Sequence, residues 1–132
     1  MYKFGGKSLN MLTGVHPDLV KVIQRAMDKQ IMDFAVLEGV RTLERQKQLF
    51  ATGASQTLAS KHLIQPDGYG HAVDIVPWPL NWKDTGRFYI LNGIVRSCAR
   101  ELGVNIRTGA DWDNDGLVLD HTFVDLPHYE LV

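Results

Sequence analysis

Residues 60–77, SKHLIQPDGYGHAVDIVP, decide how the middle of the chain folds. Turn-forming residues and the QPDGYG break predict a loop over residues 54–70. The apolar run HAVDIVP, closed by Pro77, predicts a short strand over residues 71–77. The segment holds two histidines and two aspartates, so it is either a polar loop before an ordinary strand or half of a metal site.

Asp74 is the most informative residue of this predicted strand. Because side chains alternate in direction along a strand, Asp74 and Ala72 face one way, while His71 and Val73 face the other. An ionised carboxylate in an apolar strand requires a cation, a metal ion or several hydrogen-bond donors if it is buried. The strand therefore indicates a site on the face of the sheet that carries Asp74.

The rest of the chain alternates between helix-forming and β-rich segments. Apolar residues at helical spacing and end signals at Pro17, Thr42 and Gly103 predict helices over residues 16–30, 43–53 and 85–103. Further strands are predicted over residues 32–40, 104–109 and 127–132. This order favours an α+β fold, with helices packed on a small, mostly antiparallel sheet, in a single domain spanning residues 1–132.

The composition excludes several classes of protein. Lys and Arg number 14 against 15 Asp and Glu, and 45% of residues are hydrophobic, which argues against a polycationic nucleic-acid binder and a disordered chain. Cys98 is the only cysteine, so an intramolecular disulfide and a CxxC zinc site are excluded; we expect its side chain in the core. No run approaches the roughly 18 apolar residues of a membrane span. We expect a soluble monomer made in the cytoplasm.

His62, Asp74 and His128 form a candidate metal site. One loop and two strands can bring them together, and three N and O ligands with an open fourth position are typical of catalytic zinc. Asp125, three residues before His128, is suited to act as general base. On chemistry alone, a lone histidine near a strand end is more often a structural or surface residue, and Arg41 could simply pair with a neighbouring glutamate.

The residues and their order resemble the LAS-type zinc peptidases, which include D-alanyl-D-alanine dipeptidases and carboxypeptidases and phage L-alanyl-D-glutamate endolysins. An SxH motif followed by GxAxD is present as Ser60, His62, Gly70, Ala72 and Asp74. DLPHYEL resembles the closing acid-xx-His-x-Glu element of the family, and EGVRT resembles its arginine segment. DWDNDG together with FVDLPHYEL is most similar to the phage endolysins, and the resemblance covers nearly the whole chain.

This resemblance implies a role for each matching residue. His62, Asp74 and His128 would be the zinc ligands, and Asp125 the catalytic acid and base. Arg41 would be the cation that binds the oxyanion, and Ser60 would lie at the substrate-binding edge. Glu130 would orient a ligand histidine. Seven residues separate His62 from Gly70, where the compact family pattern has two, so His71 stays an alternative ligand.

The implied function is hydrolysis of the L-alanyl-D-glutamate bond of peptidoglycan stem peptides by a zinc-activated water. A phage endolysin of this kind is held in the cytoplasm of the infected host cell until a holin releases it to the periplasm. One alternative is a D-Ala-D-Ala dipeptidase or carboxypeptidase that uses the same chemistry. Another is a zinc-binding module without catalysis.

The acidic segment DWDNDGLVLD resembles the opening of a calcium-binding loop. Asp111, Asp113 and Asp115 occupy positions 1, 3 and 5, and a glycine occupies position 6. Position 12 is Thr122, where a bidentate Glu is expected, although Asp120 is nearby. The segment is either a Ca²⁺ site that orders a loop or a series of Asx-turns in solvent.

Overall fold

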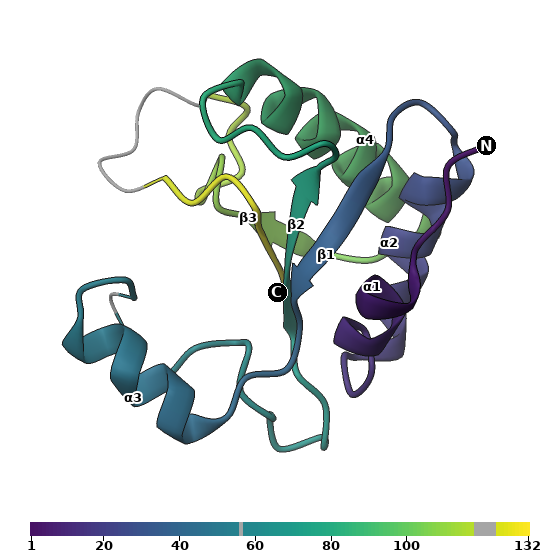
Figure 1. Cartoon of the computed structure of the whole chain (residues 1–132). Helices are drawn as coiled ribbons and strands as arrows, with labels where there is room; N and C mark the ends of the chain where they lie inside the picture. Colours follow the sequence, from purple (N-terminus) through teal and green to yellow (C-terminus); the bar gives the residue numbers. More distant parts are fainter. Residues whose placement is uncertain (56, 118–123) are drawn as a thin grey trace.

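The computed structural model describes residues 1–55, 57–117 and 124–132, in which helices pack against one sheet (Figure 1). The helices are α1 (Gly6–Met11), α2 (Pro17–Asp28), α3 (Leu43–Ala51) and α4 (Thr85–Leu102). The strands are β1 (Phe34–Glu38), β2 (Ala72–Pro77), β3 (Ile106–Thr108) and β4 (His128–Leu131). The predicted α+β fold is confirmed. No helix among the described residues is long and apolar enough to cross a membrane.

The helix ends follow from local side-chain chemistry. Pro17 is the first residue of α2, and the His16 side chain accepts a hydrogen bond of 3.0 Å from the backbone N–H of Asp18. Thr42 caps α3 by accepting a bond from a backbone N–H in the first turn. Gly103 follows α4 with a φ of 69°, a left-handed conformation that glycine adopts without strain. The three predicted end signals therefore act as expected.

Helices α2 and α4 cover one face of the sheet and supply half of the buried core residues. Leu19 and Ile23 of α2 are fully buried, as are Val95 and Cys98 of α4, which agrees with a core position for the cysteine. The adjacent Val20 is only partly buried and packs at the edge of this core. The apolar periodicity of both helices thus predicted which face of each helix packs into the core.

The sheet has the strand order β1-β2-β4-β3, and its described strands all pair antiparallel. Glu38 of β1 lies opposite Asp74 of β2, and Asp74 in turn lies opposite His128 of β4. This register aligns three polar residues in one row across the sheet. It brings together segments 54 residues apart in the chain.

The two faces of the sheet have different partners. Val36, Val73 and Ile75 point into the core beneath α2 and α4. Because side chains alternate along a strand, Asp74 and Val76 point to the opposite face. In Figure 1 this second face is open toward α3, which stands apart from the sheet. The helices therefore leave one face of the sheet available for a site.

Helix α1 was not expected from the sequence. Its segment begins with glycine and has no apolar repeat of its own. It is held by tertiary contacts, because the buried hydroxyl of Ser8 accepts a 3.1 Å hydrogen bond from the backbone N–H of Val36 in β1. The helix thereby covers an edge of the sheet that would otherwise present unpaired backbone groups.

Gly109 is required where the chain leaves β3 and passes close to the backbone of Asp125 and His128. Its N–H donates to the carbonyl of His128 and its carbonyl accepts from the N–H of Asp125, both at 2.9 Å. A Cβ at this position would overlap the backbone carbonyl of Asp125. We expect Gly109→Ala to lower the free energy of unfolding by about 1 to 3 kcal/mol, measured by urea denaturation.

Gly93→Ala is the matched control, because Gly93 lies within α4 with open space around the added methyl group. There the substitution should raise stability by about 0.5 to 1 kcal/mol through helix propensity. Equal stability of G109A and the wild type would show that the two backbones do not approach this closely.

Candidate metal centre and active site

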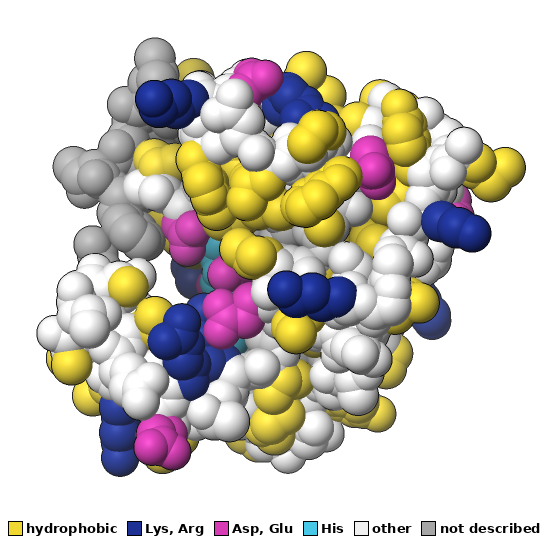
Figure 2. All heavy atoms as spheres, in the orientation of Figure 1, with side chains coloured by type: hydrophobic (Ala, Val, Ile, Leu, Met, Phe, Trp, Pro, Cys, Tyr) yellow, Lys and Arg dark blue, Asp and Glu magenta, His cyan; other side chains and the backbone are white. Residues whose placement is uncertain are grey.

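His62, Asp74 and His128 converge on one point of the open sheet face. The Nε2 of His62 and the Nδ1 of His128 each lie 3.2 Å from the same oxygen, Oδ1 of Asp74. One potential ligand atom from each residue lies within 4.8 Å of the others. Figure 2 shows histidine, acidic and basic side chains together in a hollow of the surface. The structure thus brings together all three predicted metal ligands.

The second nitrogen of each imidazole is already hydrogen-bonded to a neighbouring oxygen. His62 Nδ1 lies 2.8 Å from the carbonyl oxygen of Gly39, which can only accept, so Nδ1 carries the proton. His128 Nε2 lies 2.8 Å from the Glu130 carboxylate and donates in the same way. In the neutral imidazoles, the nitrogens that face Asp74 therefore present lone pairs.

These donors fit a divalent metal ion such as zinc. Two lone pairs and a carboxylate oxygen directed at one point repel each other unless a cation or a proton lies between them. Tetrahedral ligands about 2.0 to 2.1 Å from zinc lie roughly 3.3 Å apart, close to the 3.2 Å between each imidazole nitrogen and Asp74 Oδ1. The contacts with Gly39 and Glu130 are the kind that orient metal-bound histidines.

Without a metal ion, the protonation of the cluster is set by burial and by the charges of its own residues. Burial lowers the pKa of His128, but hydrogen bonds and charges from Asp74 and Glu130 outweigh it and raise the pKa to about 9. Burial raises the pKa of Asp74, but hydrogen bonds from His128 and His62 hold it well below its usual range. A proton on His128 therefore supplies positive charge in the metal-free protein.

Asp125 lines the same cavity, which has a volume of about 530 Å³. Burial and the neighbouring negative charge of Asp74 raise the pKa of Asp125, despite the opposing charges of His128, His62 and Arg41. Its backbone N–H is held by Gly109, as described above. A carboxylate with a raised pKa beside the cluster is suited to accept and return a proton.

Arg41 also faces this cavity, held by its neighbours. Its guanidinium donates to both carboxylate oxygens of Glu38, at 2.7 and 2.8 Å, and to Gln46 at 2.6 Å. The pairing with Glu38, considered above as the alternative to a catalytic role, is therefore present. One guanidinium nitrogen lies 3.9 Å from Asp74, so the same side chain also reaches the cluster.

Ser60 and His71 have different surroundings from the cluster. The buried hydroxyl of Ser60 lines the cavity and accepts a 3.1 Å hydrogen bond from the backbone N–H of His62. His71 precedes β2, and its Nε2 lies 2.7 Å from Asp67. Of the two histidines in this segment, the structure brings only His62 to Asp74.

Several residues around the site were not identified from the sequence. Gln46 is fully buried and bonds both Arg41 and the backbone carbonyl of Thr57. On the other side, Trp112 lies with its ring centre 5.4 Å from that of His128, and the guanidinium of Arg107 lies over the Trp112 ring. No sequence motif marked these contacts, because they depend on how distant segments pack.

Arg107 also forms a 2.9 Å ion pair with Glu130, directly opposite on the neighbouring strand. Glu130 is thus held between Arg107 and His128. Side-chain alternation along β4 places His128 and Glu130 on one face of the sheet, in agreement with the 2.8 Å contact between them.

The carboxylates of Asp111, Asp113 and Asp115 lie within reach of a common ion. Asp111 is fully buried, accepts a bond from the N–H of Gly116 and lies 3.3 Å from Arg96. Asp113 and Asp115 each accept from a backbone N–H two residues on, the geometry of Asx-turns. Asp120 and Thr122 lie outside the described residues, so calcium binding stays a prediction without support from the structure.

An α+β fold that gathers three N and O donors, a carboxylate with a raised pKa and an arginine in one cavity is typical of metal-dependent hydrolases. The family model described as phage L-alanyl-D-glutamate peptidase matches residues 1–132. The L-alanyl-D-glutamate peptidase of Escherichia phage T5 is 33% identical over an alignment of 121 residues, which covers 87% of this chain and 85% of that protein. The chain therefore belongs to the phage L-alanyl-D-glutamate peptidase family.

Solved structures agree with this assignment. The L-Ala D-Glu endopeptidase ChiX of Serratia marcescens is 34% identical and superimposes with a TM-score of 0.79, covering 98% of this chain and 90% of that one. The predicted resemblance and the predicted peptidase class are both confirmed.

The protonation of His128 predicts how stability depends on pH without metal. A histidine whose folded pKa is raised stabilises the fold fully below its unfolded pKa, about 6.5, and this contribution is lost as pH rises through about 9. The melting temperature of the protein in a chelator should therefore fall between pH 6.5 and 9. His128→Gln should show a smaller fall over this window, and identical slopes for the two proteins would contradict the prediction.

Proposed function

We propose that this protein is a zinc-dependent peptidoglycan endopeptidase that hydrolyses the L-alanyl-D-glutamate bond of stem peptides. The observation that carries the proposal is the convergence of His62, Asp74 and His128 in a cavity that also contains Asp125 and Arg41. The bond is inferred from the family and from the named activity of its relatives.

His62, Asp74 and His128 would hold the zinc ion through Nε2, a carboxylate oxygen and Nδ1. Zinc bound to such a donor set supplies Lewis acidity, which polarises a carbonyl and lowers the pKa of water. Gly39 and Glu130 fix the tautomers of the two histidines, so that both ligand nitrogens are directed at the same point.

Asp125 would take a proton from the attacking water and return it to the amine that leaves. Its raised pKa suits both halves of this transfer, because the carboxylate binds a proton more readily than an exposed aspartate does. The guanidinium of Arg41 would hold the carbonyl oxygen as negative charge develops on it. Glu38 and Gln46 keep that guanidinium in place, and Ser60 would form part of the substrate-binding edge.

The family also suggests where the protein acts. Residues 1–132 would form a single catalytic domain that works as a monomer on peptidoglycan. As a phage endolysin, it would stay in the cytoplasm of the infected cell and reach its substrate in the periplasm after holin release.

The scissile bond can be identified from the products. Digestion of purified peptidoglycan by the zinc-loaded protein should release peptides with a new N-terminal D-glutamate and leave alanine on the glycan, as measured by mass spectrometry. A D-Ala-D-Ala peptidase would instead release D-alanine or its dipeptide. D-alanine as the sole product would overturn the proposed bond specificity.

Replacing Asp125 separates an enzyme from a non-catalytic zinc module. Asp125→Asn should lower kcat by about 10² to 10⁴-fold, because it removes the proton acceptor. The variant should still bind one equivalent of zinc by metal analysis, whereas Asp74→Ala should lose that zinc. His71→Ala is the control and should keep both zinc and activity. Full activity of D125N would remove Asp125 from the mechanism.

A further inference from the structure

A second hollow, of about 350 Å³, lies between the N-terminal segment with α1 and the β1 side of the sheet. Its lining is largely apolar, with charged groups at the rim. It is formed mainly by the N-terminal segment, β1 and the start of the loop after β2, including Lys3, Lys7, Asp33, Leu37, Val76 and Trp78. Figure 2 shows hydrophobic side chains gathered next to the hollow that holds the acidic and histidine groups. We call this second hollow the Trp78 groove.

The strand register places the Trp78 groove directly next to the catalytic cavity. Glu38 and Asp74 are paired across β1 and β2, and both line the catalytic cavity. Leu37 precedes Glu38, Val76 follows Asp74 by two residues on the same face, and both line the groove. At about 3.4 Å per residue along the chain, Val76 lies about 7 Å from Asp74 and Trp78 about 14 Å from it.

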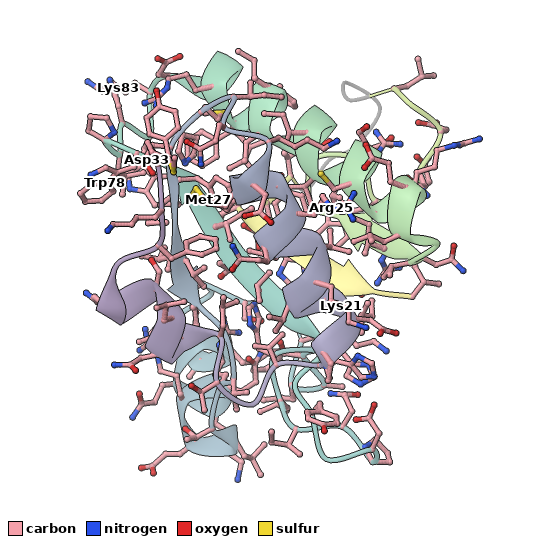
Figure 3. All side chains as sticks on the ribbon, turned by 90° about the vertical axis from the view of Figure 1, so that its right-hand side faces the viewer. Lys21, Arg25, Met27, Asp33, Trp78 and Lys83 are labelled. Carbon is pink, nitrogen blue, oxygen red and sulfur yellow. The ribbon has the colours of Figure 1, made fainter. Side chains whose placement is uncertain are left out.

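Trp78 presents an exposed indole on a fixed backbone. Its side chain is 51% exposed, although its N–H donates to the carbonyl of Asp33 and its carbonyl accepts from Arg87, at 3.0 and 2.8 Å. In Figure 3, Trp78 and Asp33 lie at the margin of the molecule, away from α2. The nearby Trp82 is equally exposed but stacks on Phe88 and does not line the groove.

We propose that the Trp78 groove binds the amino sugar to which the stem peptide is attached, an inference that rests on the proposed function. In peptidoglycan, the alanine of the L-alanyl-D-glutamate unit is joined through its amino group to a lactyl-bearing sugar. One residue spans about 3.5 Å, so this sugar must lie within a short distance of the scissile carbonyl. The groove begins near that distance, at Leu37 and Val76, and extends away from Asp74 to the indole of Trp78.

The groove also has the chemistry of a saccharide site. The C–H face of a pyranose ring stacks on an indole, and its acetamido methyl group fits an apolar wall such as the exposed Leu37. The ammonium groups of Lys3 and Lys7 and the carboxylate of Asp33 can meet hydroxyl and amide groups at the rim. The concave shape favours a sugar over a lipid surface.

The test compares two substrates that differ only in the sugar. One is a free peptide that contains the L-alanyl-D-glutamate bond, and the other carries the N-acetylglucosaminyl-N-acetylmuramyl disaccharide on its alanine. We expect the wild type to have at least a tenfold higher kcat/KM for the second substrate, mainly through a lower KM. The ratio of kcat/KM for the disaccharide-bearing substrate to kcat/KM for the free peptide should fall about tenfold in Trp78→Ala. The same ratio should stay at the wild-type value in Trp82→Ala.

Leu37→Ser is a second groove variant. If W78A does not fold, the same comparison of the two substrates is made with L37S. Equal kcat/KM for both substrates in the wild type, or an unchanged ratio in the folded groove variants, would overturn the inference. If the ratio is unchanged but binding to phosphatidylglycerol vesicles depends on Trp78, the groove binds a membrane. If the ratio is unchanged but sedimentation shows a dimer that depends on Trp78, the groove binds a second copy of the chain.

Failure of the proposed function is distinguishable from failure of this inference. If the wild type cuts neither substrate, the proposed activity is wrong, and glycan binding is then measured alone. Peptide-free glycan strands should shift the indole N–H signal of Trp78 in NMR spectra, a signal assigned by its absence in Trp78→Phe. No shift at saturating glycan would remove the sugar site.

Discussion

The carboxylate of Asp74 needs positive charge beside it, and the arrangement of the catalytic cavity follows from that need. Its side chain is only 14% exposed and lies in a strand between core residues. Two imidazole nitrogens approach the same oxygen, and the opposite nitrogen of each ring is already bonded to Gly39 or Glu130. The cluster is therefore stable only with a cation or a proton at its centre, which is the electrostatic basis of a metal site.

The antiparallel register places the groups that meet this need. Asp74 sits on a central strand, with β1 on one side and β4 on the other. The end of β1 supplies Glu38, which holds Arg41, and the carbonyl of Gly39, which orients His62. The backbone N–H of Arg41 also bonds the carbonyl of His62 at 2.9 Å. One turn after β1 thus positions both the arginine and a ligand histidine.

Much of this arrangement could be predicted because it depends on short-range patterns. Strand alternation predicted the face that carries Asp74, and helix periodicity predicted the core sides of α2 and α4. The choice between His62 and His71 needed the path of a long loop, which spacing alone does not determine. Helix α1 and the contacts of Gln46 and Trp112 could not be predicted, because tertiary packing stabilises them and no local pattern marks them.

The ion pairs of the cavity leave one carboxylate available for proton transfer. Glu38 is paired with Arg41, and Glu130 lies between Arg107 and His128. Asp74 is matched by the two histidines. Asp125 has no ion-pair partner within 4 Å in the described part of the chain, and burial together with the charge of Asp74 raises its pKa. The same pairing that neutralises the other acids therefore makes Asp125 the carboxylate best able to gain and lose a proton.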